Sequence, residues 1–175
     1  MKESKVRFAL DKKGRKVVVI NEIIFYGKRS VPRKKVEKYL KKYLGEIIEV
    51  DETKESIHIA SDFPDEYTSS QDTYRTRGPY RKAKANASQG IRELIKISRK
   101  TSESANYKEK NRKKAGKGWH RYLTRFALPV MSNEMIIERY NIYIGTLVVR
   151  KSISGKLFLY DLVNIKKEDS VDFFA

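Results

Sequence analysis

The residues best suited to catalysis or binding lie late in the chain, where one histidine stands among arginines and aromatic residues. His120 lies between Trp119 and Arg121 and directly follows a strongly basic stretch. A histidine among cations keeps a low pKa and can accept a proton near neutral pH, so His120 is the candidate general acid–base residue. Plain phosphate contact is the alternative role. His58 lies in a short apolar run and is interpreted as a structural residue.

Several other chemistries are excluded or unsupported by the residue types present. The chain has no cysteine, which excludes disulfides, thiolate zinc sites and thiol nucleophiles. It has two histidines, scattered carboxylates, and no phosphate-binding glycine loop, serine elbow or helical metal motif. We therefore expect no metal and no cofactor. These residues do permit metal-free RNA cleavage, in which a ribose 2′-hydroxyl attacks the adjacent phosphorus.

The charge of the chain indicates a polyanionic partner. The 175 residues carry a formal net charge of +17, with a pI near 9.9. Such a field attracts nucleic acid, and RNA or another nucleic acid is the predicted partner. No long amphipathic helix with a lysine-rich polar face supports a membrane surface instead. Without a signal-like apolar core or a run of transmembrane length, a cytoplasmic protein is expected.

Two basic clusters precede the last strands. Positions 75–84 hold five cations and no acid, and positions 99–118 hold eight Lys or Arg against two Glu. The second stretch is predicted to be a flexible loop that grips phosphate. The candidate nucleic-acid-binding residues are Arg75, Arg77, Arg81, Lys82 and Lys84 in the first cluster, Arg112, Lys113, Lys114 and Lys117 in the second, and Arg125, Arg139 and Lys151 on the strands that follow.

The elements that position these residues are three strands predicted within 119–167. Each alternates apolar with polar residues, which is typical of an antiparallel sheet with one buried face. In the first strand, Tyr122 and Phe126 should point to one face of the sheet, and Arg121 and Arg125 to the other. Arginines hold phosphates in bidentate fashion, and aromatic rings stack unpaired bases, so the outward face suits RNA better than duplex DNA.

The whole pattern predicts one α+β domain spanning residues 1–175. Residues 1–60 should form a small N-terminal β-hairpin, an amphipathic helix and short strands. Residues 61–98 should be a helical segment, 99–118 the basic flexible loop, and 119–167 the antiparallel sheet. In this fold class the C-terminal strands form most of the sheet, and the amphipathic helices pack on one of its faces.

The segments SDFPDEY, AKANASQGIRELIKI, GWHRYLTRFALPV and RYNIYIGTLVVRKSISGKLFLYDLVNIKKE resemble a domain of phages and mobile elements. That domain is grouped with the barnase/EndoU/colicin/RelE-like nuclease superfamily, and the resemblance covers about Val17 to Glu168. It implies an α+β fold that cleaves RNA without metal, in a toxin-like protein of a bacterial host that can have a cognate immunity protein.

By position, the polar residues of the family's terminal strands correspond to Arg121, Arg125, Arg150 and Tyr160. With His120, the residues Arg121, Arg150 and Tyr160 therefore form the predicted catalytic set of a metal-independent endoribonuclease. Two positions depart from the family pattern, since His120 replaces an aromatic residue and Lys151 stands where a histidine is common. The alternative function is a non-catalytic protein that binds nucleic acid or inhibits a host nucleic-acid-guided defence complex.

Overall fold

The three late strands form the centre of the sheet. In the computed structural model, which describes residues 5–26, 32–105 and 116–174, they are β6 (Trp119–Met131), β7 (Ile137–Lys151) and β8 (Leu157–Val171). They pair antiparallel in sequence order, with β7 between the other two. Register shifts interrupt the β7–β8 ladder, at Val148/Val149 among other places, so the side-chain alternation changes phase along β8. This meander confirms the C-terminal sheet predicted from the alternation.

The N-terminal hairpin extends one edge of this meander. Its strands are β1 (Val6–Leu10) and β2 (Lys16–Ile20), and β2 runs parallel to the second half of β6 at Val18 and Val19. Asp11 closes the turn, because its Oδ1 accepts hydrogen bonds from the backbone N–H groups of Lys13 and Arg15 at 2.9 and 2.8 Å. The predicted hairpin is therefore confirmed.

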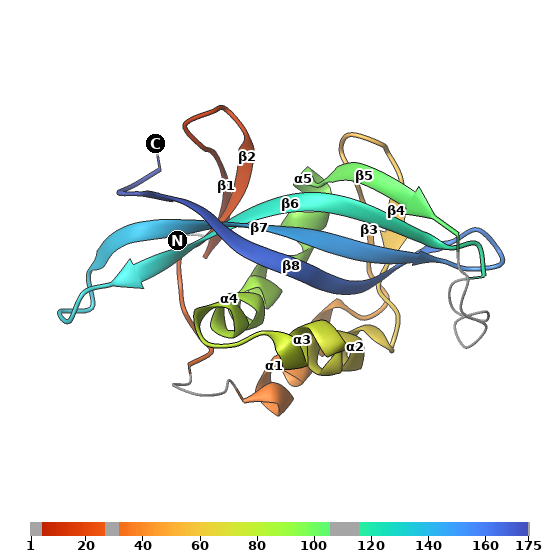
Figure 1. Cartoon of the computed structure of the whole chain (residues 1–175), viewed down its shortest axis with the longest axis horizontal. Coiled ribbons are helices and arrows are strands. Elements are labelled where there is room, and N and C mark those ends of the chain that lie inside the picture. Colours follow the sequence, from red (N-terminus) through yellow and green to blue (C-terminus); the bar gives the residue numbers. More distant parts are fainter. Residues whose placement is uncertain (1–4, 27–31, 106–115, 175) are drawn as a thin grey trace.

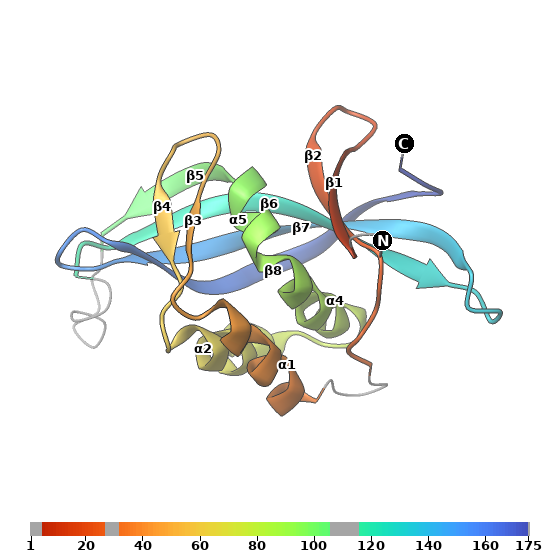
Figure 2. The same cartoon turned by 180° about the vertical axis from the view of Figure 1, so that it is seen from behind.

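A second hairpin joins the other edge. The strands β3 (Ile47–Glu49) and β4 (Ser56–His58) are antiparallel, and β4 pairs parallel with the start of β8. In the view of Figure 2 this hairpin lies on the same side of the sheet as α5. The sheet is thus curled, and Glu55, just before β4, reaches across to β6, where Tyr122 donates a hydrogen bond to it.

The stretch predicted as a basic loop contains a strand. Residues Arg99–Ser104 form β5, which pairs antiparallel with the first half of β6 from Leu123 back to Trp119. The prediction of an irregular loop is therefore wrong for these six residues. Most of the side chains of β5 are exposed, so the strand lacks the apolar alternation that marks a half-buried strand. Residues 106–115 lie outside the described residues.

The helices gather on one side of the sheet. They are α1 (Arg33–Leu40) with the 3-10 turn η1 (Lys41–Tyr43), α2 (Phe63–Ser69), α3 (Gln71–Arg75), α4 (Pro79–Ala87), the 3-10 turn η2 (Ser88–Gly90) and α5 (Ile91–Ile97). Figure 1 views the sheet from the other side, and Figure 2 shows α5 crossing in front of β6 and β7. In the described part of the chain, no helix has the length and apolar character needed to cross a membrane.

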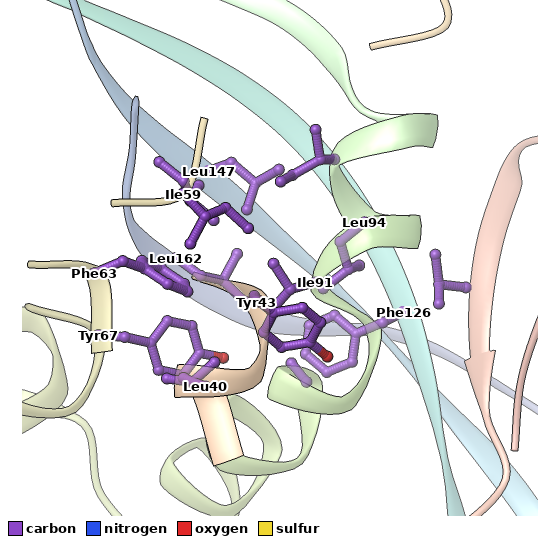
Figure 3. Packing of buried hydrophobic residues seen from close by; sticks show 14 of the residues in the cluster. Leu40, Tyr43, Ile59, Phe63, Tyr67, Ile91, Leu94, Phe126, Leu147 and Leu162 are labelled. Carbon is purple, nitrogen blue, oxygen red and sulfur yellow. The ribbon is translucent and has the colours of Figure 1, made fainter. Parts of the chain in front are cut away.

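The main core fills the space between these helices and the sheet. Figure 3 shows Tyr43 beside Ile91 and Phe126, and Leu40 beside Tyr67, with Leu94 of α5 and Leu147 of the sheet in the same cluster. All of these side chains are fully buried. A smaller cluster on the opposite face, around Val17, Val19, Ala127, Tyr140 and Ile142, lies at the end of the sheet beside β1 and β2. The middle of that opposite face is where side chains of β6 to β8 remain partly exposed.

Candidate nucleic-acid face and histidine cluster

The pleat of β6 places the predicted site residues on two opposite faces. His120, Tyr122 and Thr124 are buried towards the helices, and Thr124 Oγ1 donates a hydrogen bond to the carbonyl of Leu94 in α5 at 2.9 Å. Arg121 and the residues that alternate with it are partly exposed on the other side. The predicted set of His120 with Arg121, Arg150 and Tyr160 is therefore not one site, because successive side chains of a strand point to opposite faces.

We call the side of β6–β8 opposite α5 the open face. It is defined by side chains that are partly exposed, apart from the buried Arg150, and that share a face through strand pairing or ring contact: Trp119, Arg121, Leu123, Arg125, Ile144, Thr146, Val148, Arg150, Phe158, Tyr160 and Val163. Residues at and just before α2 reach this face near β8, where Asp62 contacts Arg150 and Glu66 contacts Tyr160. This face combines cations, aromatic rings and aliphatic groups, a composition that is typical of surfaces that bind nucleotides.

An aromatic pair lies at one end of the open face. The rings of Trp119 and Tyr160 meet edge to face, with centroids 5.0 Å apart. Burial and a hydrogen bond with Glu66 raise the pKa of the Tyr160 hydroxyl above its ordinary value. Tyr160 is therefore a neutral phenol held in place beside the tryptophan, and the two rings offer an aromatic surface.

The arginines of the open face differ in their partners. Arg121 Nη1 donates a hydrogen bond to a neutral hydroxyl, Ser104 Oγ of β5, at 3.1 Å. Arg125 Nε instead donates to the Glu168 carboxylate at 2.9 Å, and Arg15 donates to the same carboxylate oxygen at 2.9 Å. A carboxylate partner already compensates part of the charge of Arg125, so Arg121 is the better-placed cation for a phosphate.

Arg150 connects β7 to the residue that precedes α2. Its guanidinium lies 4.2 Å from the centroid of the Phe158 ring, and its Nη2 is 3.3 Å from Oδ1 of Asp62. The residue is 8% exposed. The buried, paired arginine therefore fits a structural contact better than the predicted contact with a reacting phosphate.

On the helix-covered face, His120 belongs to a cluster of ionisable groups from three strands or their ends. Its Nδ1 lies 3.4 Å from Glu55 Oε2, and its Nε2 lies 3.4 Å from Glu103 Oε1. Lys100 forms ion pairs with both carboxylates, at 3.1 Å to Glu55. The Tyr122 hydroxyl donates to Glu55 at 2.8 Å and lies 3.3 Å from His120 Nδ1. We call these five residues the His120 cluster.

The surroundings of the His120 cluster set its protonation. Burial, together with the neighbouring Lys100, lowers the pKa of His120 below its ordinary value. Burial tends to raise the pKa of Glu55, but hydrogen bonds from Tyr122 and Lys100 outweigh this and lower it. At neutral pH the cluster therefore contains a neutral imidazole and two carboxylates, with Lys100 as the cation. The sequence prediction of a neutral His120 agrees in direction, although burial is the larger cause.

A surface groove runs beside the His120 cluster. Its lining includes His58, His120, Lys151 and Lys156, together with Glu55 and the chain around Gly155. Lys151 is partly exposed and Lys156 is exposed. Lys151, predicted to bind nucleic acid, is therefore close to His120 and away from the arginines of the open face.

The basic helical patch is only partly a surface feature. Lys84 is 2% exposed, and its ammonium pairs with Asp161 Oδ1 at 2.9 Å and Asp72 Oδ2 at 3.1 Å. The prediction that Lys84 binds nucleic acid is wrong, because the interior of the fold uses this charge to compensate a buried aspartate. Arg75 and Arg77 are exposed, whereas Arg81 and Lys82 are partly buried.

The remaining predicted contacts are scattered. Lys117 is exposed at the entry to β6, and its backbone N–H donates to the carbonyl of Lys151 at 3.1 Å. Arg139 lies near the start of β7, at the end of the strand remote from Arg150, with Nη1 3.8 Å from Glu138 Oε1. Arg112, Lys113 and Lys114 lie outside the described residues.

Sequence reasoning missed Glu55, Lys100, Glu103 and Tyr122 as partners of His120. Glu55 precedes β4 and is 65 positions from the histidine, and the curl of the sheet brings the two together. The i, i+2 spacing of His120 and Tyr122 on one strand was the available signal, because it places both on one face. Comparison with protein-family models, with curated proteins and with solved structures gives no match for this chain.

Proposed function

We propose that the chain binds single-stranded nucleic acid, with RNA as the preferred class, through the open face. One observation carries the proposal. Trp119, Arg121 and Arg125 lie on one side of β6 and are partly exposed, on a chain with a net charge of +17. Residues two apart on a strand are separated by about 6.7 Å, which spaces cations and rings along an extended strand of nucleotides.

An unpaired strand suits this face better than a duplex. The exposed part of the Trp119–Tyr160 pair can stack a base, which requires the base to be unpaired and turned towards the protein. Arg121 then contacts an adjacent phosphate, and the aliphatic side chains of Leu123 and Val148 pack against sugars or bases. Duplex DNA offers its phosphates to such a face but buries its bases.

The test uses Trp119, the only tryptophan of the chain, as an intrinsic fluorescent probe. We expect an RNA oligonucleotide to quench its emission and to bind more tightly than a duplex of the same length. The logarithm of the association constant should fall with the logarithm of salt concentration, with a slope of about −0.7 for each phosphate contact. Unchanged emission at saturation, or equal affinity for the duplex, would contradict the proposal.

A second candidate function is metal-independent RNA cleavage at the His120 cluster. It is favoured by a neutral imidazole that lines a groove together with Lys151 and Lys156. In this reaction His120 takes the proton of a ribose 2′-hydroxyl, the oxygen attacks the adjacent phosphorus, and the bond to the 5′-oxygen breaks. Water supplies the proton to the leaving 5′-oxygen, and the imidazolium of His120 later returns its proton to solvent. Lys151 and Lys156 stabilise the charge on the phosphoryl oxygens. The products are a 2′,3′-cyclic phosphate and a 5′-hydroxyl.

This candidate has a direct test that the binding assay does not replace. RNA incubated with the protein in EDTA should yield fragments with cyclic phosphate ends, and His120→Asn should abolish their formation. RNA that stays intact at a large excess of protein would rule the activity out and leave the binding proposal untouched. Cleavage that persists in His120→Asn would place the chemistry elsewhere.

A further inference from the structure

Three groups that commonly ligate metal ions converge inside the His120 cluster. Glu55, Glu103 and His120 each offer one ligand atom, and the three atoms lie within 4.8 Å of one another. Glu55 directly precedes β4, Glu103 lies in β5 and His120 in β6, so the fold rather than a local motif brings them together. His120 is 3% exposed, so the surrounding packing restricts the position of its ring.

The hydrogen-bonding capacity of the imidazole leaves one of its nitrogens poorly matched. Each ring nitrogen lies 3.4 Å from a carboxylate oxygen, Nδ1 from Glu55 and Nε2 from Glu103. A neutral imidazole has one N–H donor and one lone pair. With the proton on Nδ1, the Nε2 lone pair is directed near the Glu103 carboxylate. With the proton on Nε2, the Nδ1 lone pair lies near Glu55 and near the Tyr122 hydroxyl, whose proton is donated to Glu55 at 2.8 Å. A cation between the lone pair and the carboxylate would make either arrangement more favourable.

The charges of the cluster point the same way. Two carboxylates face the single ammonium of Lys100, which contacts both of them, so the cluster retains one net negative charge when His120 is neutral. A divalent ion at the centre would neutralise both carboxylates and use the imidazole lone pair. We propose that Glu55, Glu103 and His120 form a site for a divalent transition-metal ion such as Zn²⁺, which binds by displacing the ammonium of Lys100.

The ligand types select the class of ion. One imidazole and two carboxylates suit Zn²⁺ and similar transition metals, whereas Ca²⁺ and Mg²⁺ prefer sites built from oxygen alone. Zinc–ligand bonds of about 2.0–2.2 Å place the ligand atoms of a tetrahedral site about 3.3 Å apart. The two 3.4 Å separations involve different ring nitrogens of His120, so the nitrogen that binds the ion keeps only one of them. One ligand atom from each residue lies within 4.8 Å of the other two, and the flexible glutamate side chains can make the remaining contraction.

The experiment is a calorimetric titration of the tag-free full chain with Zn²⁺. We expect one saturable site, and Co²⁺ should give visible absorption bands that Zn²⁺ removes. Glu103→Gln should weaken binding by at least about tenfold, since loss of even an outer partner of a ligand has that effect. Lys100→Met removes the competing ammonium and should strengthen binding by a similar factor.

Two neighbouring residues supply matched controls. Glu52→Gln and Lys54→Met make the same changes of side chain at exposed positions close to Glu55, and both should leave Zn²⁺ affinity unchanged. Absence of saturable binding would overturn the proposal, as would binding that Glu103→Gln and Lys100→Met do not alter. The site faces away from the open face, and the RNA cleavage assay contains EDTA, so failure here is distinguishable from failure of either candidate function.

Discussion

The side chains of His120 and Arg121 lie on opposite faces of β6, although the two residues are neighbours in the chain. His120 is 3% exposed and faces Glu55 and Glu103, whereas Arg121 is partly exposed and donates to Ser104 Oγ. Any chemistry at the imidazole is therefore separated by the sheet from the arginines of the open face. The two proposed activities belong to two surfaces and can be removed one at a time.

The first prediction concerns Arg121. Arg121→Gln should weaken the binding of single-stranded RNA severalfold and reduce the salt dependence by about one phosphate contact, because its guanidinium is the best-placed cation of the open face. Fluorescence of Trp119 measures both effects. Lys38→Gln, which removes the same charge from an exposed position on α1, should change neither. Equal losses in the two variants would mean that net charge, and not the open face, determines binding.

A second prediction isolates base stacking. Trp119→Leu should cost about 1–3 kcal/mol of affinity for single-stranded RNA, since an aliphatic side chain cannot stack on a base. Anisotropy of a labelled oligonucleotide measures the loss, as the intrinsic probe is gone. Phe173→Leu makes a comparable change at an aromatic residue that is 76% exposed and lies outside the open face. If both variants bind equally well, the aromatic pair has no part in recognition.

The sequence predicted the faces of β6 correctly because its alternation is regular. Tyr122, Thr124 and Phe126 share one face and Arg121 and Arg125 the other, as predicted, and the structure shows that the first face is the buried one. The prediction failed where alternation carries no information about distance in space. Glu55 and His120 meet only because the sheet curls. The alternation of inward and outward side chains along β8 changes at a register shift, and no residue type in the sequence indicates that shift.

The two clear errors have a common physical cause. Lys84 looked like a surface cation because lysine is rarely buried, yet Asp161 of β8 compensates it inside the fold. Residues 99–104 looked like a loop because they are polar, yet they complete the edge of β6 through backbone hydrogen bonds. Tertiary partners outweighed local composition in both places, and neither partner is a neighbour in the sequence.

A third prediction concerns Gly118, which enters β6 with φ +100°. A Cβ at this position would lie 2.0 Å from the carbonyl oxygen of Ser104, so Gly118→Ala has to displace β5 as well as strain its own backbone. We expect a loss of about 3 kcal/mol in the free energy of unfolding, measured by urea denaturation. Gly14→Ala is the control, with φ +77° but no atom within 4 Å of the added carbon. It should lose only the backbone strain of about 1–2 kcal/mol.

The last prediction concerns the buried pair of Lys84 and Asp161. Burial raises the pKa of Asp161 to about 6, and Lys84 opposes this rise. In Lys84→Met the carboxylate loses its 2.9 Å partner, and breaking such a pair typically costs about 3–5 kcal/mol. The pKa of Asp161 in the folded variant should then rise further.

This pKa rise gives the variant a characteristic pH dependence. As the pH falls from about 7.5 to about 5, folded Asp161 takes up a proton before the unfolded chain does, so protonation stabilises the folded state. The stability difference between wild type and Lys84→Met should therefore shrink at the lower pH, as urea denaturation at the two pH values can show. Lys54→Met, at an exposed position, should stay within about 0.5 kcal/mol of wild type at both. A deficit in Lys84→Met that is the same at both pH values would mean that lost packing, and not an uncompensated charge, destabilises the variant.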